Sequence, residues 1–479
     1  MPSDEHNSAE PGRGGPPPGD DGGGRAEPAL TAEIQRQVTE LARRRHEPAV
    51  RHELLRQLAD RRVAASRTPV VRFDSLPVDV GFDSLLVSGE LLITQRSFTE
   101  AEPYLDALGM VQTGMDHRQI GCEEEDAAAL ADQVVVLTHQ NRQRTPIPLG
   151  AQELADIGRN LRLRGFSAGV TSVVTSAPIV KGQGGPRPAV RGEIAPLSNE
   201  GPRVAIIDTG ISPQRAGTVL PGSMRDVLHQ FPLGNSSQAR AERRRYLSLE
   251  AGHGTFVTGI VQQLAPDAAI KVYRAVDSDG IGSEVAVASR MIQAVREGAQ
   301  ILNLSLGCQT QNDYPPVAMR AAVDWIRDWE QNHQEVLIVA AAGNYGDTRP
   351  CWPAAFPGVV SVAGLAPDML PSLWSSHGFW VTCSTVGEGL RSTFVEGTEP
   401  PLQDPAPVPA MPPRVTTFHG NPPWAAWSGT SFTAPQITGL LAQRYPGSGL
   451  TLRDTLQQIL SEGRPLPDFG QAVHVLDGI

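Results

Sequence analysis

The sequence predicts an α/β protein, in which a doubly wound, mostly parallel sheet with helices on both faces follows a smaller α+β domain. Strand candidates at 204–207, 270–273 and 301–304 are nearly continuous apolar runs, as expected of parallel strands buried on both faces. They alternate with helix candidates at 285–297 and 317–331. Such alternation is typical of a parallel sheet covered by helices.

The segment before this unit has a different pattern. Strand and helix signals alternate twice within residues 68–180, which indicates a small α+β sandwich. No combination of residues in this segment suggests catalysis. Its predicted elements are strands at 84–93, 134–137 and 170–175 and helices at 99–108 and 151–163.

Composition sets the other boundaries. Residues 1–30 are rich in Gly, Pro and Asp and bury too little apolar surface to fold, so we expect a disordered tail. Residues 31–66 carry apolar residues at helical spacing and form an amphipathic helical segment, with its arginines on a solvated face. The Gly- and Pro-rich residues 181–200 form a linker between the 68–180 domain and the unit at 201–479.

Charge and cysteine usage exclude several classes of protein. The 41 basic and 52 acidic residues give a net charge of −11, which does not favour binding to nucleic acid or to an anionic membrane. The first 24 residues lack the apolar segment of a secretory signal, so we expect a cytoplasmic protein. The four cysteines include no CxxC pair. We therefore expect buried free thiols, no metal and no cofactor.

Four polar residues stand where a strand ends or a helix begins. Asp208 lies in VAIIDTGIS, His253 in GHGTFVTGI, Asn344 in VLIVAAAGN and Ser431 in SGTSFTAPQ. Ligands of open α/β sheets bind beyond the carboxyl ends of the strands. We therefore predict that these four side chains meet at one edge of the sheet.

Together these residue types suit acyl transfer. The Ser431 hydroxyl needs a base to take its proton, and His253 can serve because imidazole titrates near neutrality. A buried Asp208 would hold the imidazole and stabilise its charged form. The Asn344 amide and the Ser431 backbone N–H would supply an oxyanion hole. Each of these four residues alone is more simply explained as a helix cap or a turn residue. The prediction therefore rests on the four residues together.

The motifs DTG, HGTxVxG, AAGN and GTSxxAP, in this order, resemble those of the subtilase family of serine proteases over about 201–447. The order Asp, His, Ser is that of subtilisin. The resemblance implies a subtilisin-like fold and a serine endopeptidase with an acyl-enzyme on Ser431. Two departures, Phe256 in place of the second histidine of HGTHVAG and GTSFTA in place of GTSMA, alter the pocket shape and leave the triad unchanged.

The resemblance also implies a peptide or protein substrate that binds as an added strand. Small residues in the wall of the pocket for the side chain before the scissile bond, with Tyr345 at its rim, predict that a large apolar side chain fits there. The wall comprises Ala341, Ala342 and Gly343. The implied strand-binding residues are Gly280, Gly282, Ser305, Leu306 and Gly307.

The role of the 68–180 domain stays open at this point. Many subtilases carry an inhibitory α+β propeptide, and this domain resembles one in its general pattern of strands and helices. We predict that it packs on the protease and controls access, with 181–202 as linker or cut site. The alternative is an unrelated domain that binds a regulatory partner.

The motifs bear on three functional classes. The leading one is an intracellular processing or regulated effector protease. A second is a catalytically silent binding module with the same fold. An esterase of α/β-hydrolase type requires GxSxG and the order Ser, Asp, His, whereas Ser431 lies in GTSFT and follows both of its partners.

Overall fold

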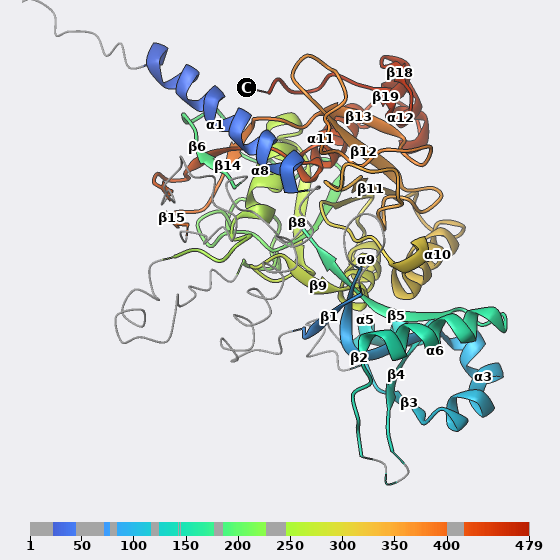
Figure 1. The fold of residues 1–479 in the computed structure, drawn as a ribbon. Helices are drawn as coiled ribbons and strands as arrows, with labels where there is room; N and C mark the ends of the chain where they lie inside the picture. The colour runs from blue at the N-terminus through green and yellow to red at the C-terminus, as the bar shows by residue number, and fades with distance from the viewer. Residues whose placement is uncertain are drawn as a thin grey trace, which may run out of the picture.

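The computed structural model describes residues 23–44, 71–76, 84–115, 124–141, 143, 145–176, 185–226, 246–399 and 416–478. These residues form a larger unit, at the top of Figure 1, and a smaller one below it. Among the described residues, no helix is long and apolar enough to cross a membrane.

An eight-stranded sheet forms the centre of the larger unit, in the order β18-β19-β13-β12-β11-β10-β7-β8. All neighbouring strands are parallel except β18 and β19. This confirms the predicted parallel sheet. The strands are β7 (Arg203–Asp208), β8 (Ala269–Arg274), β10 (Ile301–Leu304), β11 (Leu337–Ala341), β12 (Val360–Leu365), β13 (Cys383–Val386), β18 (Arg464–Leu466) and β19 (Gly470–Ala472).

Helices cover both faces of this sheet. Because side chains alternate along a strand, Val204 and Ile206 pack into one apolar cluster and Ala205 and Ile207 into another. Helices α8 (His253–Leu264), α11 (Ala434–Arg444) and α12 (Leu452–Ser461) contribute to the first cluster. Helices α9 (Glu284–Arg296) and α10 (Val317–Glu330) contribute to the second.

The smaller unit is α+β, as predicted, with an antiparallel sheet in the order β3-β4-β2-β5 and β1 beside β2. The sequence patterns missed β1, β3 and α5, which are short. The elements are β1 (Phe73–Leu76), β2 (Ser84–Thr94), α3 (Gln95–Ala107), β3 (Met110–Thr113), α5 (Glu124–Ala131), β4 (Val134–His139), α6 (Ala151–Leu163) and β5 (Ala168–Thr175).

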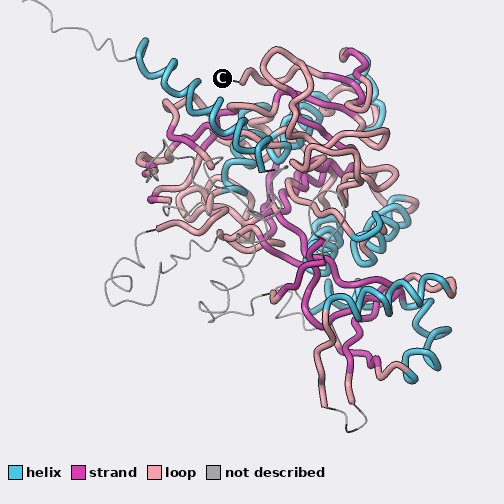
Figure 2. Tube along the Cα trace, viewed as in Figure 1, coloured by secondary structure: helices cyan, strands magenta, loops and turns pink. Residues whose placement is uncertain are grey.

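Strand β5 joins the two units. It pairs antiparallel with β9 (Ile281–Ser283) of the larger unit, so the sheet of the smaller unit ends on a strand of the larger one. Figure 2 shows these strands, in magenta, passing from one unit to the other.

The remaining elements frame one side of the larger unit. Strand β17 (Trp424–Trp427) lies between β14 (Leu390–Thr393) and β6 (Arg187–Pro188) and leads into the 3₁₀ turn η3 (Thr430–Phe432). The other elements are β15 (Gly397–Thr398), β16 (Thr417–Phe418) and η2 (Gln311–Asp313).

Helix α1 (Gly23–Arg44) corrects one boundary. Residues 23–30, which we predicted to be disordered, are helical, because α1 packs its apolar side on β17 through Leu30 and Ile34. Composition alone does not reveal such a tertiary contact. Residues 1–22, and 45–66 of the predicted amphipathic segment, lie outside the described residues. Within the predicted linker, residues 187 and 188 form β6.

Candidate active site

Asp208 and His253 form a buried pair at the end of β7. Asp208 is the last residue of this strand and His253 the first of α8. The Asp208 Oδ1 atom lies 2.8 Å from His253 Nδ1, and both side chains are no more than 1% exposed. Asp208 therefore fixes the orientation of the His253 ring.

Two glycines let the chain pass close to this pair. Gly252 has φ +86°, a left-handed conformation that favours glycine. A Cβ on Gly254 would lie 2.4 Å from the Gly210 carbonyl oxygen. Glycine is therefore required on both sides of His253, at Gly252 for its backbone conformation and at Gly254 for lack of space.

Ser431 and Asn344 lie at the ends of different elements. Ser431 sits in η3 ahead of α11, and Pro435 falls in the first turn of that helix, where it causes no break. Asn344 follows β11, and its Oδ1 accepts hydrogen bonds from the Thr430 N–H (2.8 Å) and Thr430 Oγ1 (2.9 Å). These donors fix the amide orientation, so the Asn344 nitrogen is the donor left to face a substrate oxygen.

An aromatic cluster supports the histidine. The His253 ring lies 5.4 Å from the ring of Trp427 and 5.4 Å from that of Phe432, the residue after Ser431. Phe256 packs on both, at 5.8 and 4.6 Å. Phe256, which replaces the second histidine of the family motif, therefore completes the apolar packing beneath the site.

The predicted strand-binding residues hold a segment of the chain itself. Thr175, the last residue of β5, exchanges two backbone hydrogen bonds with Gly307, of 3.0 and 2.9 Å. On the other side Val174 pairs with Gly282. The end of β5 thus runs between the two segments that we predicted to hold a substrate.

The next residue, Ser176, contacts Ser431. The Ser176 N–H donates to the Gly280 carbonyl (3.1 Å), and Ser431 Oγ donates to the Ser176 carbonyl (2.9 Å). Ser305 contributes from below, because its hydroxyl donates to the Ser431 carbonyl (2.6 Å). The structure therefore brings these predicted residues together around residue 176.

The side-chain pocket beside Ser431 is narrow. Two of the predicted wall residues, Ala341 and Gly343, line it together with Tyr345, which we predicted at its rim. Its lining also includes Leu306, Gly307 and Cys351, and Thr175 and Ser176 of the segment that occupies the cleft. The volume left in the pocket is about 10 Å³, which is enough for about one water molecule. The prediction for the Ala342 side chain was wrong. Ala342, the residue after β11, packs instead with Ala363, Leu365 and Phe469.

Asp226 is a site residue that sequence reasoning missed. It is 3% exposed, and burial raises the pKa of its carboxyl to about 6. Its Oδ2 accepts the Gly252 N–H (2.8 Å) and its Oδ1 accepts the Ser278 hydroxyl (2.7 Å). Asp226 thus joins the segment before His253 to the loop that carries Gly280. Its local sequence, MRDVL, gives no signal of this role.

Glu284, also missed, holds the smaller unit. This first residue of α9 is fully buried, and burial raises the pKa of its carboxyl to about 7. It accepts the backbone N–H of Ser172 in β5 and that of Ala318 in α10, both at 2.7 Å. A carboxylate of the larger unit therefore binds the backbone of the strand that enters the cleft.

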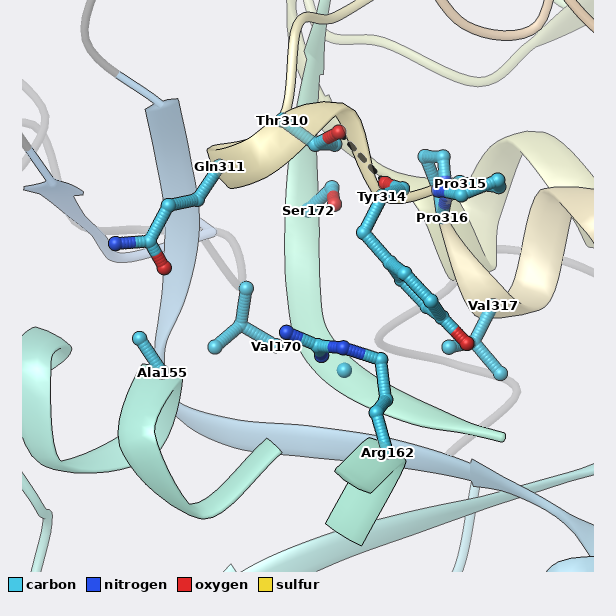
Figure 3. Close-up of a pocket in the computed structure, with 11 residues that line it drawn as sticks. Ala155, Arg162, Val170, Ser172, Thr310, Gln311, Tyr314, Pro315, Pro316 and Val317 are labelled. Carbon is cyan, nitrogen blue, oxygen red and sulfur yellow. Dashed lines mark hydrogen bonds between the residues drawn. The ribbon is translucent and has the colours of Figure 1, made fainter. Parts of the chain in front are cut away.

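A second contact between the units lies beside α6 (Figure 3). The Arg162 guanidinium lies over the Tyr314 ring, 4.2 Å from its centroid, and donates to the Ala168 carbonyl (2.9 Å). Thr310 Oγ1 donates to the Tyr314 carbonyl (2.6 Å) and so holds the segment that carries this ring.

Three cysteines are free and buried: Cys308, Cys351 and Cys383. Burial raises the pKa of each thiol above its ordinary value. Thiolate chemistry is therefore suppressed at these positions. Cys122 lies outside the described residues. In the described part of the chain, no three His, Cys, Asp or Glu residues group as a metal would require.

Comparison with known proteins gives consistent results. The model of the subtilase family matches residues 199–462, more than half of the 479 residues. The chain is 27% identical over 253 residues to thermitase of Thermoactinomyces vulgaris, a match that covers 50% of this chain and 73% of thermitase. It is 28% identical to a thermophilic serine proteinase of Bacillus sp. (strain AK1), of which the match covers about half (52%, with 51% of this chain).

Among solved structures, fervidolysin from Fervidobacterium pennivorans, a keratinolytic enzyme related to subtilisin, matches with a TM-score of 0.52 and 17% identity. The match covers 84% of this chain and 61% of fervidolysin. At this identity the likeness concerns the fold.

Proposed function

Because this chain belongs to the subtilase family and is a serine-type endopeptidase, we propose that Ser431 is its nucleophile, His253 its general base and acid, and Asp208 the group that orients His253. The observation that carries these roles is the buried 2.8 Å contact between Asp208 and His253, beside the turn that holds Ser431.

In the proposed reaction, Ser431 Oγ attacks the carbonyl carbon of the scissile peptide bond while His253 Nε2 takes the hydroxyl proton. The Asn344 amide nitrogen and the Ser431 N–H donate hydrogen bonds to the resulting oxyanion. His253 then gives the proton to the departing amine, and the C–N bond breaks to leave an acyl-enzyme. Water, deprotonated by His253, hydrolyses the ester and restores Ser431.

Labelling with a fluorophosphonate probe, together with a peptide-cleavage assay, tests these roles. We expect Ser431→Ala to abolish both signals and Ser448→Ala, at an exposed serine, to leave both unchanged. If the wild type, cut between residues 176 and 185 and freed of fragment 1–176, reacts with no probe and cleaves no peptide, a binding module with the subtilase fold replaces this proposal.

We further propose that the smaller unit inhibits the enzyme by placing the end of β5 in the cleft. The support is the hydrogen bond from Ser431 Oγ to the Ser176 carbonyl and the backbone pairing of Thr175 with Gly307. This geometry favours self-cleavage at the 176–177 bond, ahead of the 181–202 region that the sequence suggested. The finer role, an intracellular processing or regulated effector protease, stays a prediction.

Intact-mass analysis of the wild type and Ser431→Ala tests self-cleavage. We expect a new N-terminus at Ala177 in the wild type alone. If both proteins stay full length, the smaller unit blocks the cleft without being cut there, and the self-cleavage proposal is wrong.

A further inference from the structure

Helix α1 touches the larger unit far from the smaller one. In Figure 1 the helix, in blue, crosses beside β6 and β14, whereas the smaller unit lies at the opposite end of the molecule. The side chains of Leu30 and Ile34 are buried against Ala426 of β17, with Val38 and Ala189 packed around them. The catalytic unit thus presents a surface, formed by β6 and β17, that an amphipathic helix covers.

A buried amide fixes the register of this contact. Gln37 is fully buried, and its Nε2 donates to the carbonyls of Gly185 (2.9 Å) and Ala426 (3.1 Å). Its Oε1 accepts the hydroxyl of Ser428 (2.8 Å), three residues before Ser431. A buried amide is unfavourable unless its hydrogen bonds are made. Since both protons and the oxygen of Gln37 are engaged only in this position, the helix docks in one register.

An ion pair adds charge complementarity at the same place. Arg187 Nε lies 3.0 Å from Glu33 Oε2, with both side chains less than 20% exposed. The same guanidinium donates to the carbonyls of Gly185 and Pro186. Helix α1 therefore recognises the backbone and a side chain of residues 185–187, which directly follow the segment where the chain would be cut.

We infer that α1 is a second anchor of the N-terminal region, which keeps residues 1–176 bound to the catalytic unit after the chain is cut between 176 and 185. Its importance for blocking the cleft rests on the proposed function, whereas the anchoring itself does not.

The physical reason is bivalency. Once β5 is bound in the cleft, α1 rebinds from an effective concentration of the order of millimolar, so that each contact holds the other in place. Most of the stability of a helix in a protein comes from tertiary packing of its apolar face, which in α1 is the packing of Leu30 and Ile34. We therefore expect α1 to fold as it docks, and its release to require local unfolding as well as lost contacts.

The experiment uses the full chain with Ser431→Ala and with residues 177–184 replaced by the recognition sequence of a site-specific protease. After cutting, the dissociation rate of fragment 1–176 from the rest is measured by surface plasmon resonance with the C-terminal part immobilised. Gln37→Ala removes the buried amide, whereas Gln35→Ala makes the same change at an exposed position of the same helix. Thermal unfolding before cutting checks that each variant is folded.

We expect Gln37→Ala to release the fragment at least roughly tenfold faster than Gln35→Ala, and Ile34→Asp to do so by roughly 100-fold or more. Equal dissociation rates of fragment 1–176 in all three variants would overturn the proposal that α1 is an anchor. Because Ser431→Ala lacks the proposed nucleophile, this result does not depend on activity. A parallel series with Ser431 intact reports fluorophosphonate labelling. Absence of labelling there after fragment 1–176 has dissociated would count against the proposed function alone.

Discussion

Replacing Tyr345 with alanine is expected to widen the substrate specificity. An ideal Cβ on Gly343 would lie 3.0 Å from the Tyr345 ring and 2.9 Å from Cys351 Sγ, and one on Gly307 would lie 2.7 Å from the same sulfur. The ring and the sulfur therefore fill the depth that the two glycines leave. The small wall residues suggested a pocket for a large apolar side chain, but this packing supports a preference for Gly, Ala or Ser before the scissile bond.

The magnitude follows from the surface that a larger side chain can bury. A phenylalanine side chain that moves from water into an open pocket gains about 1.5–3 kcal/mol, which corresponds to roughly 10- to 150-fold in kcat/KM. In the wild type we expect this gain to be absent, because Tyr345 and Cys351 fill the depth of the pocket, where about 10 Å³ remains with Thr175 and Ser176 in its lining. We expect Tyr345→Ala to raise the ratio of kcat/KM for Phe over Ala peptides by that factor.

The assay is a series of peptides that differ only at the residue before the scissile bond, from Gly to Phe, and it uses enzyme that has been cut between residues 176 and 185 and freed of fragment 1–176. Cys351→Ala should give a smaller shift of the same sign. Phe379→Ala, which removes an aromatic ring that is 95% exposed, should give none. If the wild type already cleaves Phe peptides as fast as Ala peptides, the ring is no barrier and the reasoning is refuted.

Three further predictions concern single polar groups. Asn344→Ala should lower kcat by about 10²–10³ with little change in KM, and an unchanged kcat in steady-state assays would remove it from the oxyanion hole. Asp226→Asn can no longer accept both the Gly252 N–H and the Ser278 hydroxyl, so kcat at pH 8 should fall about tenfold. As pH rises through 6, the melting temperature of the wild type should fall relative to that of Asp226→Asn, because the wild-type carboxyl then becomes charged while it is buried. If the variant has the kcat of the wild type and the same pH dependence of melting temperature, Asp226 does not have this role. Burial raises the pKa of Glu284 to about 7 from an ordinary 4.5, so its contribution to folding stability is fully present below about pH 4.5 and is lost as pH rises through 7. The melting temperature of the full chain should therefore fall as pH rises through this range, and Glu284→Gln should flatten this dependence; an equal slope in the variant would exclude Glu284 as its source.

The sequence predicted features that local patterns determine. Continuous apolar strands indicated the parallel sheet, and the residues at their ends lie where predicted: Asp208 ends β7 and Asn344 follows β11. The roles of Glu284 and Gln37 could not be predicted, since their hydrogen-bond partners lie 112 and 389 residues away along the chain. The extent of α1 was missed for the same reason, because the helix packs against β17, which is distant in the sequence.

The edges of the cleft explain why the N-terminal region needs contacts beyond it. Strand β9 and residue Gly307 offer backbone groups that pair equally well with any extended chain, and here they hold Thr175 and its neighbours. If these bonds alone held the inhibitory strand, a good substrate would compete with it on equal terms. Additional affinity for the N-terminal region therefore has to come from surfaces that a substrate does not reach. Glu284 supplies one by binding the Ser172 N–H, the Tyr314 ring beneath Arg162 supplies a second, and the surface beneath α1 supplies a third. Changes on these three surfaces should alter the lifetime of inhibition while leaving the intrinsic kcat/KM for peptides unchanged.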